Sequence, residues 1–254
     1  MASKIALITG ASSGIGQACA HAFAAAGYDL IIAARRKSRI DELGRLLEEQ
    51  HAIKVVKIEL DVRDQSAVES SIAALTTPWK KIDVLVNNAG LSRGLVAFND
   101  GLISDWDEML DTNVKGLLYV SRAVTPLMVK RQSGHVINVG SIAGHEVYPN
   151  GAVYCASKHA VDAITTGMRM DLCKHRVKVS TVDPGLVNTE FSNVRFHGDQ
   201  QRADSTYNGM TPLSAVDVAE TVLWMASTPQ HVNIAEVLLL PTDQAAATVV
   251  RRDS

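Results

Sequence analysis

The chain has 254 residues, of which 46% are hydrophobic, 20% charged and 5% aromatic, a composition typical of a globular protein with an aliphatic core. Its 25 basic and 27 acidic residues give a formal net charge of −2, and no long stretch carries one sign, so we expect no nucleic-acid partner. The sequence has no apolar run near the roughly 20 residues that span a bilayer, no export signal, and three cysteines without metal-ligand spacing, so we expect a cytoplasmic protein with free thiols and no membrane partner.

Apolar runs of strand length alternate with helical patterns along the chain. The expected strands cover residues 4–9, 29–34, 54–61, 84–87, 135–139, 178–182 and 237–240. The expected helices cover residues 15–26, 38–49, 65–75, 106–130, 154–173 and 215–226. This alternation predicts repeated βα units around a parallel sheet. We therefore expect an α/β fold, a single doubly wound Rossmann domain over residues 1–254, with a mainly parallel seven-stranded sheet and helices on both faces.

Residues 188–213 have no clear period and are rich in Asn, Gly, Asp and Gln. They follow an expected strand at its carboxyl end, where ligand-covering loops occur in open α/β sheets. We expect this segment to be a substrate-covering loop. The chain has no internal repeat and no interdomain linker, which favours one domain.

A glycine-rich turn joins the first expected strand to the first expected helix. Backbone amides at a helix N-terminus carry partial positive charge, and glycines let a pyrophosphate approach them closely. A glycine-rich turn alone is weak evidence for a dinucleotide site, because glycines also shape ordinary turns, but its place after the first strand favours one. The turn residues expected to contact the cofactor are Gly10, Ser12, Ser13, Gly14, Ile15 and Gly16.

The turn, Thr-Gly-Ala-Ser-Ser-Gly-Ile-Gly, resembles that of the short-chain dehydrogenase/reductase family. At the end of the second expected strand, where an NAD-binding protein usually has an acid for the ribose hydroxyls, the sequence has Arg35 and Arg36. Because a guanidinium binds phosphate bidentately, these arginines favour NADP and its 2′-phosphate. The alternative is that both arginines are solvated residues at the start of the next helix.

The resemblance extends to three further cofactor segments. It implies an adenine contact at Asp61 and Val62, and a supporting motif at Asn88, Ala89 and Gly90. It also implies a nicotinamide-side segment that includes Pro184, Gly185, Val187 and Thr189. Asp61 could almost as well be a turn or capping residue, and Pro184 and Gly185 could equally form an ordinary turn, whereas this alternative is weaker for the Asn-Asn-Ala-Gly string.

Tyr154 and Lys158 lie four residues apart in a helical pattern, so their side chains project from one face of the helix. An isolated Tyr-x-x-x-Lys string is often only an exposed helix pair. Here, however, Ser141 ends the preceding strand, and a loop can bring the serine and tyrosine hydroxyls together. A nearby lysine ammonium and an oxidised nicotinamide ring would favour the phenolate form of the tyrosine.

The family resemblance assigns roles to these residues. It implies that Ser141 holds the substrate carbonyl oxygen, that Tyr154 transfers the proton, and that Lys158 binds the nicotinamide ribose and lowers the tyrosine pKa. It implies a water-linked proton relay at Asn113, although an asparagine within a helix can simply bond to local backbone or bend the helix. Tyr154 and Lys158 would also contact the cofactor. Hydride transfer belongs to the nicotinamide, so no metal is needed.

A narrower resemblance covers residues 189–199, 211–213 and 241–245, which are similar to the NADP-dependent 3-hydroxy acid dehydrogenases, a group that includes enzymes oxidising serine and L-allo-threonine. Arg195 is then the candidate residue to bind the substrate carboxylate, together with Ser141 and Tyr154 at the reacting oxygen. Alternatively, Arg195 is a structural residue paired with Glu190 or Asp199.

Two other functions compete with this interpretation. One is a carbonyl reductase for neutral ketones or aldehydes, which a substrate panel would distinguish. The other is a protein that binds NADP(H) without turnover, although such a protein would not need Tyr154. The resemblance also implies a homotetramer, with contacts through helices 106–130 and 154–173, while residues 245–254 either reach a neighbouring subunit or fray.

Overall fold

The computed structural model describes residues 3–253 and contains one seven-stranded sheet. Its strands are β1 (Ile5–Thr9), β2 (Asp29–Ala34), β3 (Val55–Glu59), β4 (Ile82–Asn87), β5 (Gly134–Val139), β6 (Val177–Pro184) and β9 (Glu236–Leu239). They lie in the order β3-β2-β1-β4-β5-β6-β9, and every neighbouring pair is parallel. Because both faces of the central strands are covered, β1 and β2 are almost wholly apolar.

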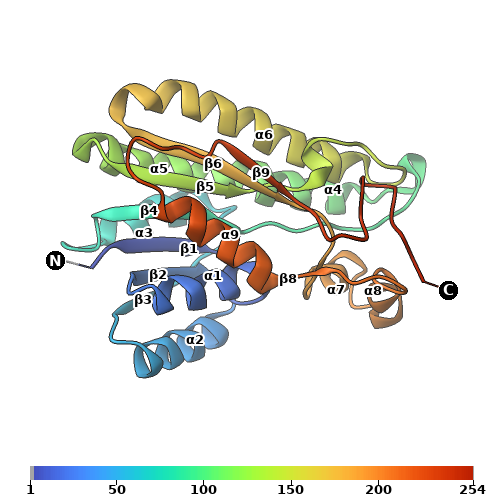
Figure 1. The fold of residues 1–254 in the computed structure, drawn as a ribbon, viewed down its shortest axis with the longest axis horizontal. Coiled ribbons are helices and arrows are strands. Elements are labelled where there is room, and N and C mark those ends of the chain that lie inside the picture. Colours follow the sequence, from blue (N-terminus) through green and yellow to red (C-terminus); the bar gives the residue numbers. More distant parts are fainter. Residues whose placement is uncertain (1–2, 254) are drawn as a thin grey trace.

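Helices cover both faces of the sheet (Figure 1). One layer holds α1 (Gly14–Ala25), α2 (Lys37–Gln50) and α9 (Ala215–Ser227), and the other holds α3 (Gln65–Ala74), α5 (Leu117–Arg131) and α6 (Ala152–Leu172). The first layer packs around Phe23 and the second around Met128, both fully buried. The predicted doubly wound Rossmann-like fold is confirmed, with strands that end within three residues of their expected limits.

The prediction of one continuous helix over residues 106–130 is wrong, because the helix is interrupted. The structure has α4 (Ile103–Leu110), a π-helical turn over Asp111–Gly116, and then α5. Within the π turn, the Asn113 side chain bonds to the backbone of Leu91 rather than to its own helix. A Cβ on Gly116 would lie 2.6 Å from Val62 Cγ2, so this turn also packs closely on the loop after β3. These tertiary contacts explain the irregular turn.

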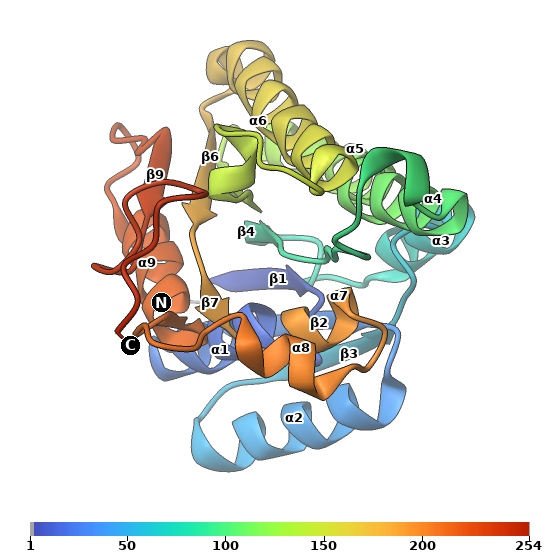
Figure 2. The same cartoon turned by 90° about the vertical axis from the view of Figure 1, so that its right-hand side faces the viewer.

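Residues 188–213 are more ordered than the predicted loop. They include α7 (Phe191–Arg195) and α8 (Gln200–Ser205), and their ends belong to the short parallel pair β7 (Val187–Asn188) and β8 (Leu213–Ser214). Figure 2 shows α7 and α8 lying across the ends of the central strands. Three single 3-10 turns complete the secondary structure, at Phe98–Asp100, Ile142–Gly144 and Cys173–His175.

Residues 245–253 fold back on their own chain, while Ser254 lies outside the described residues. The backbone N–H of Ala247 donates to Glu146 Oε2 at 2.7 Å, and that of Asp253 donates to Gly209 O at 2.7 Å. In this structure the described part of the tail therefore contacts its own chain. Among residues 3–253, no helix is both long and apolar enough to cross a membrane.

Candidate active site

A cavity of about 760 Å³ opens at the carboxyl ends of the central strands. Its walls include Gly10 after β1, Asn88 after β4, Gly140 after β5 and Gly185 after β6. Ligands bind at this edge in open α/β sheets, and the size suits a cofactor with a small substrate. The lining residues that the sequence had marked are Gly10, Ser13, Gly14, Ile15, Asn88, Ala89, Gly90, Ser141, Tyr154, Lys158, Pro184, Gly185, Val187, Thr189 and Arg195.

The glycine-rich turn is held against the loop after β4. Asn88 Nδ2 donates to the carbonyl oxygens of Thr9 and Gly10, at 3.0 and 3.2 Å. Gly10 and Gly14 both have positive φ, of 66° and 54°. A Cβ on Gly16 would lie only 2.4 Å from Asn88 Nδ2 and from Gly10 O. The first turn of α1 therefore presents its backbone N–H groups to the cavity, as a pyrophosphate requires.

Arg36, rather than Arg35, lies at the glycine-rich turn. Its guanidinium donates to Ser12 Oγ at 2.9 Å and to Ser13 Oγ at 2.6 Å. It also pairs with Glu190 at 2.9 Å, and the same carboxylate pairs with Arg39 at 2.7 Å. Two arginines thus share one carboxylate, and Arg36 also binds two hydroxyls, an arrangement that a phosphate could share. Arg39 was not predicted from the sequence, where only its position three residues after Arg36 pointed to this site.

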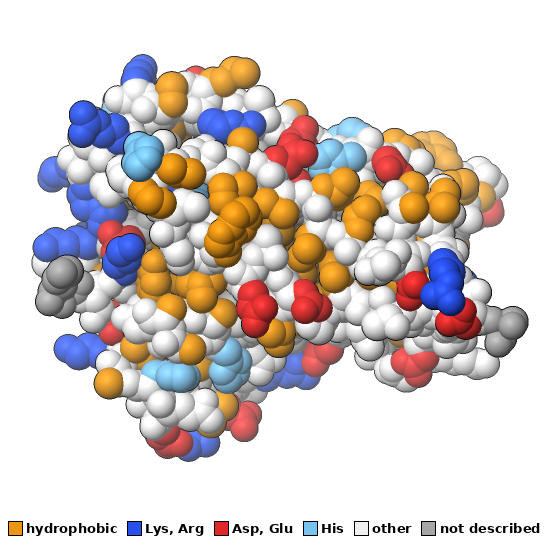
Figure 3. Space-filling view, viewed as in Figure 1, with side chains coloured by type: hydrophobic (Ala, Val, Ile, Leu, Met, Phe, Trp, Pro, Cys, Tyr) orange, Lys and Arg blue, Asp and Glu red, His pale blue; other side chains and the backbone are white. Residues whose placement is uncertain are grey.

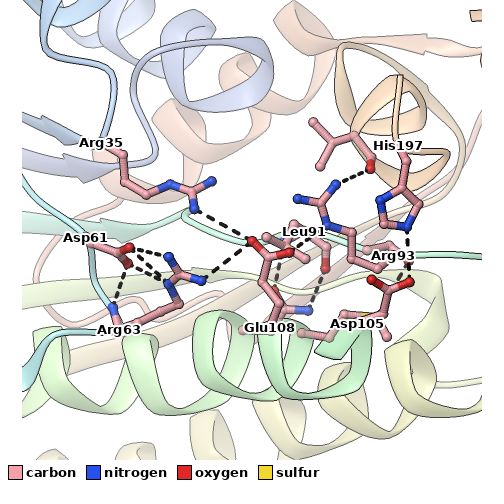
Figure 4. A network of polar contacts seen from close by, with 12 residues as sticks. Arg35, Asp61, Arg63, Leu91, Arg93, Asp105, Glu108 and His197 are labelled. Carbon is pink, nitrogen blue, oxygen red and sulfur yellow. Dashed lines mark hydrogen bonds and ion pairs between the residues drawn. The ribbon is translucent and has the colours of Figure 1, made fainter. Parts of the chain in front are cut away.

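Arg35 turns instead toward an ionic network beside the cavity (Figure 4). Its guanidinium lies 3.7 Å from Glu108, which also pairs with Arg93 at 2.7 Å and Arg63 at 3.6 Å. Arg63 in turn binds Asp61 at 2.6 Å. Partial burial raises the pKa of Asp61, but the hydrogen bonds and charge of Arg63, together with the charge of Arg35, outweigh it and hold the pKa below its ordinary value. Arg35, Asp61 and the neighbouring Val62 are not among the described residues that line the cavity.

The same network fastens the covering segment. Arg93 donates to Val194 O at 2.7 Å, and Gly94 N donates to Arg195 O at 2.8 Å. His197 Nε2 lies 3.1 Å from Asp105 Oδ2, as Figure 4 shows. These contacts tie α7 to α4 and to the loop after β4. The covering segment is consequently closed over the cavity.

Tyr154, Lys158 and Ser141 meet inside the cavity. α6 carries the tyrosine and lysine one turn apart, and both side chains are buried. Lys158 Nζ donates to Val139 O at 2.9 Å and lies 5.9 Å from the centre of the tyrosine ring. Ser141 stands at the end of β5, where its hydroxyl accepts from Ala143 N at 3.1 Å. The sequence spacing thus brings the three side chains to one place.

Burial dominates the electrostatics of this group. It raises the pKa of Tyr154, while Tyr148 raises it further and Arg195 and Ser141 lower it. Burial also lowers the pKa of Lys158 to about 8, although the charge of Asp183 acts in the opposite direction. Within the protein itself, Arg195 and Ser141 are two groups that favour the phenolate of Tyr154.

Asn113 lies at the centre of the π turn and is almost completely buried. Its Oδ1 accepts from Leu91 N at 2.8 Å, and its Nδ2 donates to Leu91 O at 2.8 Å and to Ser157 Oγ at 3.0 Å. Asn113 therefore joins the loop after β4 to α6, one position before Lys158. Its side chain does not bond to neighbouring backbone of its own helix, which had been the structural alternative.

Arg195 lies directly above the catalytic tyrosine candidate. Its guanidinium carbon is 5.2 Å from the centre of the Tyr154 ring. It donates to Ser92 Oγ at 3.0 Å and to Tyr148 OH at 2.8 Å. The proposed structural pairing is absent within residues 3–253, because Glu190 pairs with Arg36 and Arg39, and Asp199 accepts from Arg202 N. Arg195 thus keeps its charge for a ligand.

The sequence analysis also missed residues of the cavity wall. Ser92 and Tyr148 hold Arg195, and Gln244 Oε1 accepts from Leu186 N at 2.8 Å, which supports the nicotinamide-side segment. Leu186 lies beside Gly185, where a Cβ would come within 2.2 Å of the same Gln244 oxygen. From the C-terminal tail, Ala247, Thr248, Val250 and Arg252 line the cavity. Only tertiary structure brings these segments together, so local spacing gave no signal for them.

A cradle for a dinucleotide that leads to a buried tyrosine defines an oxidoreductase acting on CH–OH groups. Residues 4–200 match the family described as short chain dehydrogenase, and the chain belongs to this family. It is 44% identical to the NADP-dependent 3-hydroxy acid dehydrogenase YdfG of Salmonella typhi. The similarity extends over 244 residues, which is 96% of this chain and 97% of that protein.

Two further relatives bear on the substrate. The chain is 44% identical over 253 residues to sulfoacetaldehyde reductase 2 of Chromohalobacter salexigens, which covers 99% of this chain and all of that protein. It also resembles a solved structure, the closed form of serine dehydrogenase complexed with NADP+, with a TM-score of 0.91 and 41% identity over 98% of this chain and 100% of the other.

Proposed function

We propose that the protein is an NADP-dependent dehydrogenase that moves a hydride between nicotinamide and the hydroxyl carbon of a small 3-hydroxy acid, such as serine, L-allo-threonine or 3-hydroxyisobutyrate. The observation that carries the proposal is the position of Arg195, an arginine without an acidic partner among the described residues, above the ring of Tyr154. A short substrate can then place its alcohol at the tyrosine and its acid group at the arginine.

The residues present fit NADP. The first turn of α1 would hold the pyrophosphate, where glycine leaves room that a Cβ would fill. Arg36 and Arg39, with Ser12 and Ser13, would hold the 2′-phosphate. We keep Arg35, Asp61 and Val62 as candidate contacts of the adenosine half. Asn88, Ala89, Gly90, Pro184, Gly185, Val187 and Thr189 would support the other half. When bound, the nicotinamide supplies the hydride chemistry.

The protein residues manage the proton and the position of the substrate. Tyr154 would exchange a proton with the alcohol oxygen, and Ser141 would hold that oxygen by a hydrogen bond. Lys158, held by Val139 O, would bind the nicotinamide ribose, and Asn113 would support a water-linked relay behind it. Because Tyr154 is deeply buried, its pKa must fall when the site fills, and Arg195 is one group that lowers it.

The acid group of the substrate would bind the N–H groups of Arg195 that Ser92 and Tyr148 do not use. A guanidinium forms charge-assisted hydrogen bonds in a fixed plane, and both partners hold that plane in place. Because α7 is fastened over the cavity, the acid is also shielded from water, which strengthens its attraction to the arginine. The clamp would thus fix the distance from acid to alcohol and select short substrates.

The test is a substrate panel with NADP+ or NAD+, followed by absorbance of the reduced nicotinamide. We expect activity with L-serine, L-allo-threonine or 3-hydroxyisobutyrate, a preference for NADP+, and loss of turnover in Tyr154→Phe with cofactor binding retained. Activity mainly on neutral secondary alcohols would instead support a carbonyl reductase. Cofactor binding without turnover in either direction would mean a protein that only binds NADP(H), and would refute the proposal.

A small sulfonate is a second candidate substrate. The sulfoacetaldehyde reductase relative covers the whole chain, and a guanidinium binds sulfonate as well as carboxylate oxygens. Two more arginines, Arg202 and Arg252, line the same cavity and would favour a strongly anionic group. Including isethionate and sulfoacetaldehyde in the panel separates the two, since a higher kcat/KM for either sulfonate than for the hydroxy acids would favour this candidate.

We further propose a homotetramer in the cytoplasm. The three cysteines are unpaired, as expected in a reducing compartment. Exposed apolar side chains support association: Met170 on α6 is 71% exposed and Trp224 on α9 57%. Figure 3 shows hydrophobic side chains gathered over the neighbouring parts of β9 and α9. Sedimentation of the purified protein tests the assembly, and a single species of monomer mass would contradict it.

A further inference from the structure

Three potential metal ligands meet beside the active site, each from a different part of the fold. His145 follows the 3-10 turn after β5, Asp183 lies near the end of β6, and Glu236 begins β9. Nε2 of His145 lies 3.3 Å from Asp183 Oδ2 and 3.8 Å from Glu236 Oε1. In Figure 3, histidine and acidic side chains stand next to each other on this face, above β9.

The carboxylate of Asp183 is the unusual member of this cluster, because it is only 2% exposed. One of its oxygens is fully used: Oδ1 accepts from Thr181 Oγ1 at 2.8 Å and from Ser141 N at 3.2 Å. The other, Oδ2, is buried, has no hydrogen-bond partner, and faces His145. A buried carboxylate oxygen without a partner carries a large desolvation cost. His145, whose Nε2 lies 3.3 Å from this oxygen, is positive only when protonated, so a bound cation would supply a compensating charge that does not depend on protonation.

We propose that His145, Asp183 and Glu236 form a binding site for a divalent transition-metal ion, with zinc as the first candidate. Ligands bonded to tetrahedral zinc at 2.0–2.2 Å lie roughly 3.3–3.6 Å apart. His145 lies 3.3 and 3.8 Å from the two carboxylate oxygens, and all three ligand atoms lie within 4.8 Å of one another, so the exposed Glu236 side chain would have to move closer to complete the site. The exposed side of the cluster leaves the fourth position for water.

The ligand types favour a transition metal over magnesium or calcium. One imidazole and two carboxylates suit zinc, cobalt or manganese, whereas magnesium and calcium prefer oxygen ligands alone. A bound cation would stabilise both carboxylates in their ionised forms.

The site is separate from the hydride-transfer chemistry but touches its scaffold. Asp183 holds the backbone N–H of Ser141 and directly precedes Pro184 and Gly185. It also fills the space beside Gly140, where a Cβ would lie 1.8 Å from Asp183 Oδ1. A bound metal would thus brace the ends of β5 and β6 without contacting the substrate. The inference does not depend on the proposed substrate.

The test is calorimetric titration of the purified chain with zinc chloride, after treatment with a chelator and without cofactor or substrate. We expect one saturable zinc site per chain. His145→Ala and Glu236→Gln should each weaken binding by more than about tenfold, because losing even a hydrogen-bond partner of a metal ligand typically costs about 10–100-fold. The matched controls His231→Ala and Glu220→Gln make the same changes at exposed positions outside the cluster and should leave binding unchanged.

Glu236→Gln alters an exposed side chain, so it tests the proposal even if His145→Ala fails to fold. Titration with cobalt chloride, followed by visible absorption, gives a second readout. Coordination by nitrogen and oxygen ligands produces a visible absorption band, which should be absent in His145→Ala and in Glu236→Gln. The proposal is overturned if wild-type protein shows no saturable binding, or if zinc binds with the same affinity and stoichiometry in Glu236→Gln.

Discussion

Replacing Arg195 by methionine should remove the acid-binding group and retain most of the side-chain volume. In the structure, Ser92 and Tyr148 take two of the five guanidinium N–H donors, so three remain, of which a substrate acid can use two. Hydrogen bonds to charged groups contribute about 1.5–3 kcal/mol each. Losing two should therefore cost about 3–6 kcal/mol, which corresponds to about two to four orders of magnitude in kcat/KM for the hydroxy acid.

Arg195 also lowers the pKa of Tyr154, so part of the loss should be common to every substrate. Steady-state kinetics with a neutral secondary alcohol measure this common part, which we expect to be less than about tenfold, or about 1.4 kcal/mol. Arg45→Met, on the distant α2, is the matched control and should leave both substrates unchanged. If the hydroxy acid and the neutral alcohol lose kcat/KM equally, Arg195 does not bind the acid group.

Three other predictions concern charge. Glu190→Gln should tighten NADP+ about tenfold by fluorescence titration and leave NAD+ unchanged, because the carboxylate competes with phosphate for Arg36; equal effects on both would contradict this. Burial lowers the pKa of His135 to about 3, so below pH 6.5 the unfolded chain binds more protons than the folded one. The free energy of unfolding should therefore fall as pH drops from 6.5 towards 3. His135→Gln should make the free energy of unfolding, measured by urea denaturation, less dependent on pH in this range. Lys158→Met should abolish turnover yet raise the free energy of unfolding by up to about 3 kcal/mol at pH 7. The pKa of the lysine is lowered to about 8 in the folded protein, so folding must either bury its charge or remove its proton, and methionine avoids both costs. This gain should shrink as pH rises from 8 to 10.5, and a variant less stable than wild type at pH 7 would refute it.

The sheet could be predicted from the sequence because its strands are covered on both faces. β1 and β2 are buried along almost their whole length, so they appear as continuous apolar runs that stand out from the helical patterns. The break in the helix around Asn113 could not be predicted in the same way. It depends on hydrogen bonds to Leu91, 22 positions away, and local propensity does not report such contacts.

For the candidate site, too, local spacing could be predicted from the sequence and distant contacts could not. Tyr154 and Lys158 could be paired because helical spacing alone sets their relation, and Ser141 because it ends the strand before them. Arg39, Tyr148 and the C-terminal tail could not be assigned. Each reaches the cavity through a partner distant in the chain, as when Arg39 meets Glu190, 151 positions away.

The arrangement around Tyr154 suggests why the acid clamp and the catalytic base occupy the same few ångströms. A buried phenol resists ionisation, and the charge of Arg195, 5.2 Å from the ring, lowers its pKa. An acidic substrate would partly neutralise that arginine as it binds, raising the tyrosine pKa again. The positive charge of the oxidised nicotinamide must then compensate, so proton abstraction should depend on the cofactor being bound as well as on the substrate. Neutral substrates would leave the charge of Arg195 available to the phenolate, so their pH–rate profiles should begin to rise at lower pH than those of hydroxy acids.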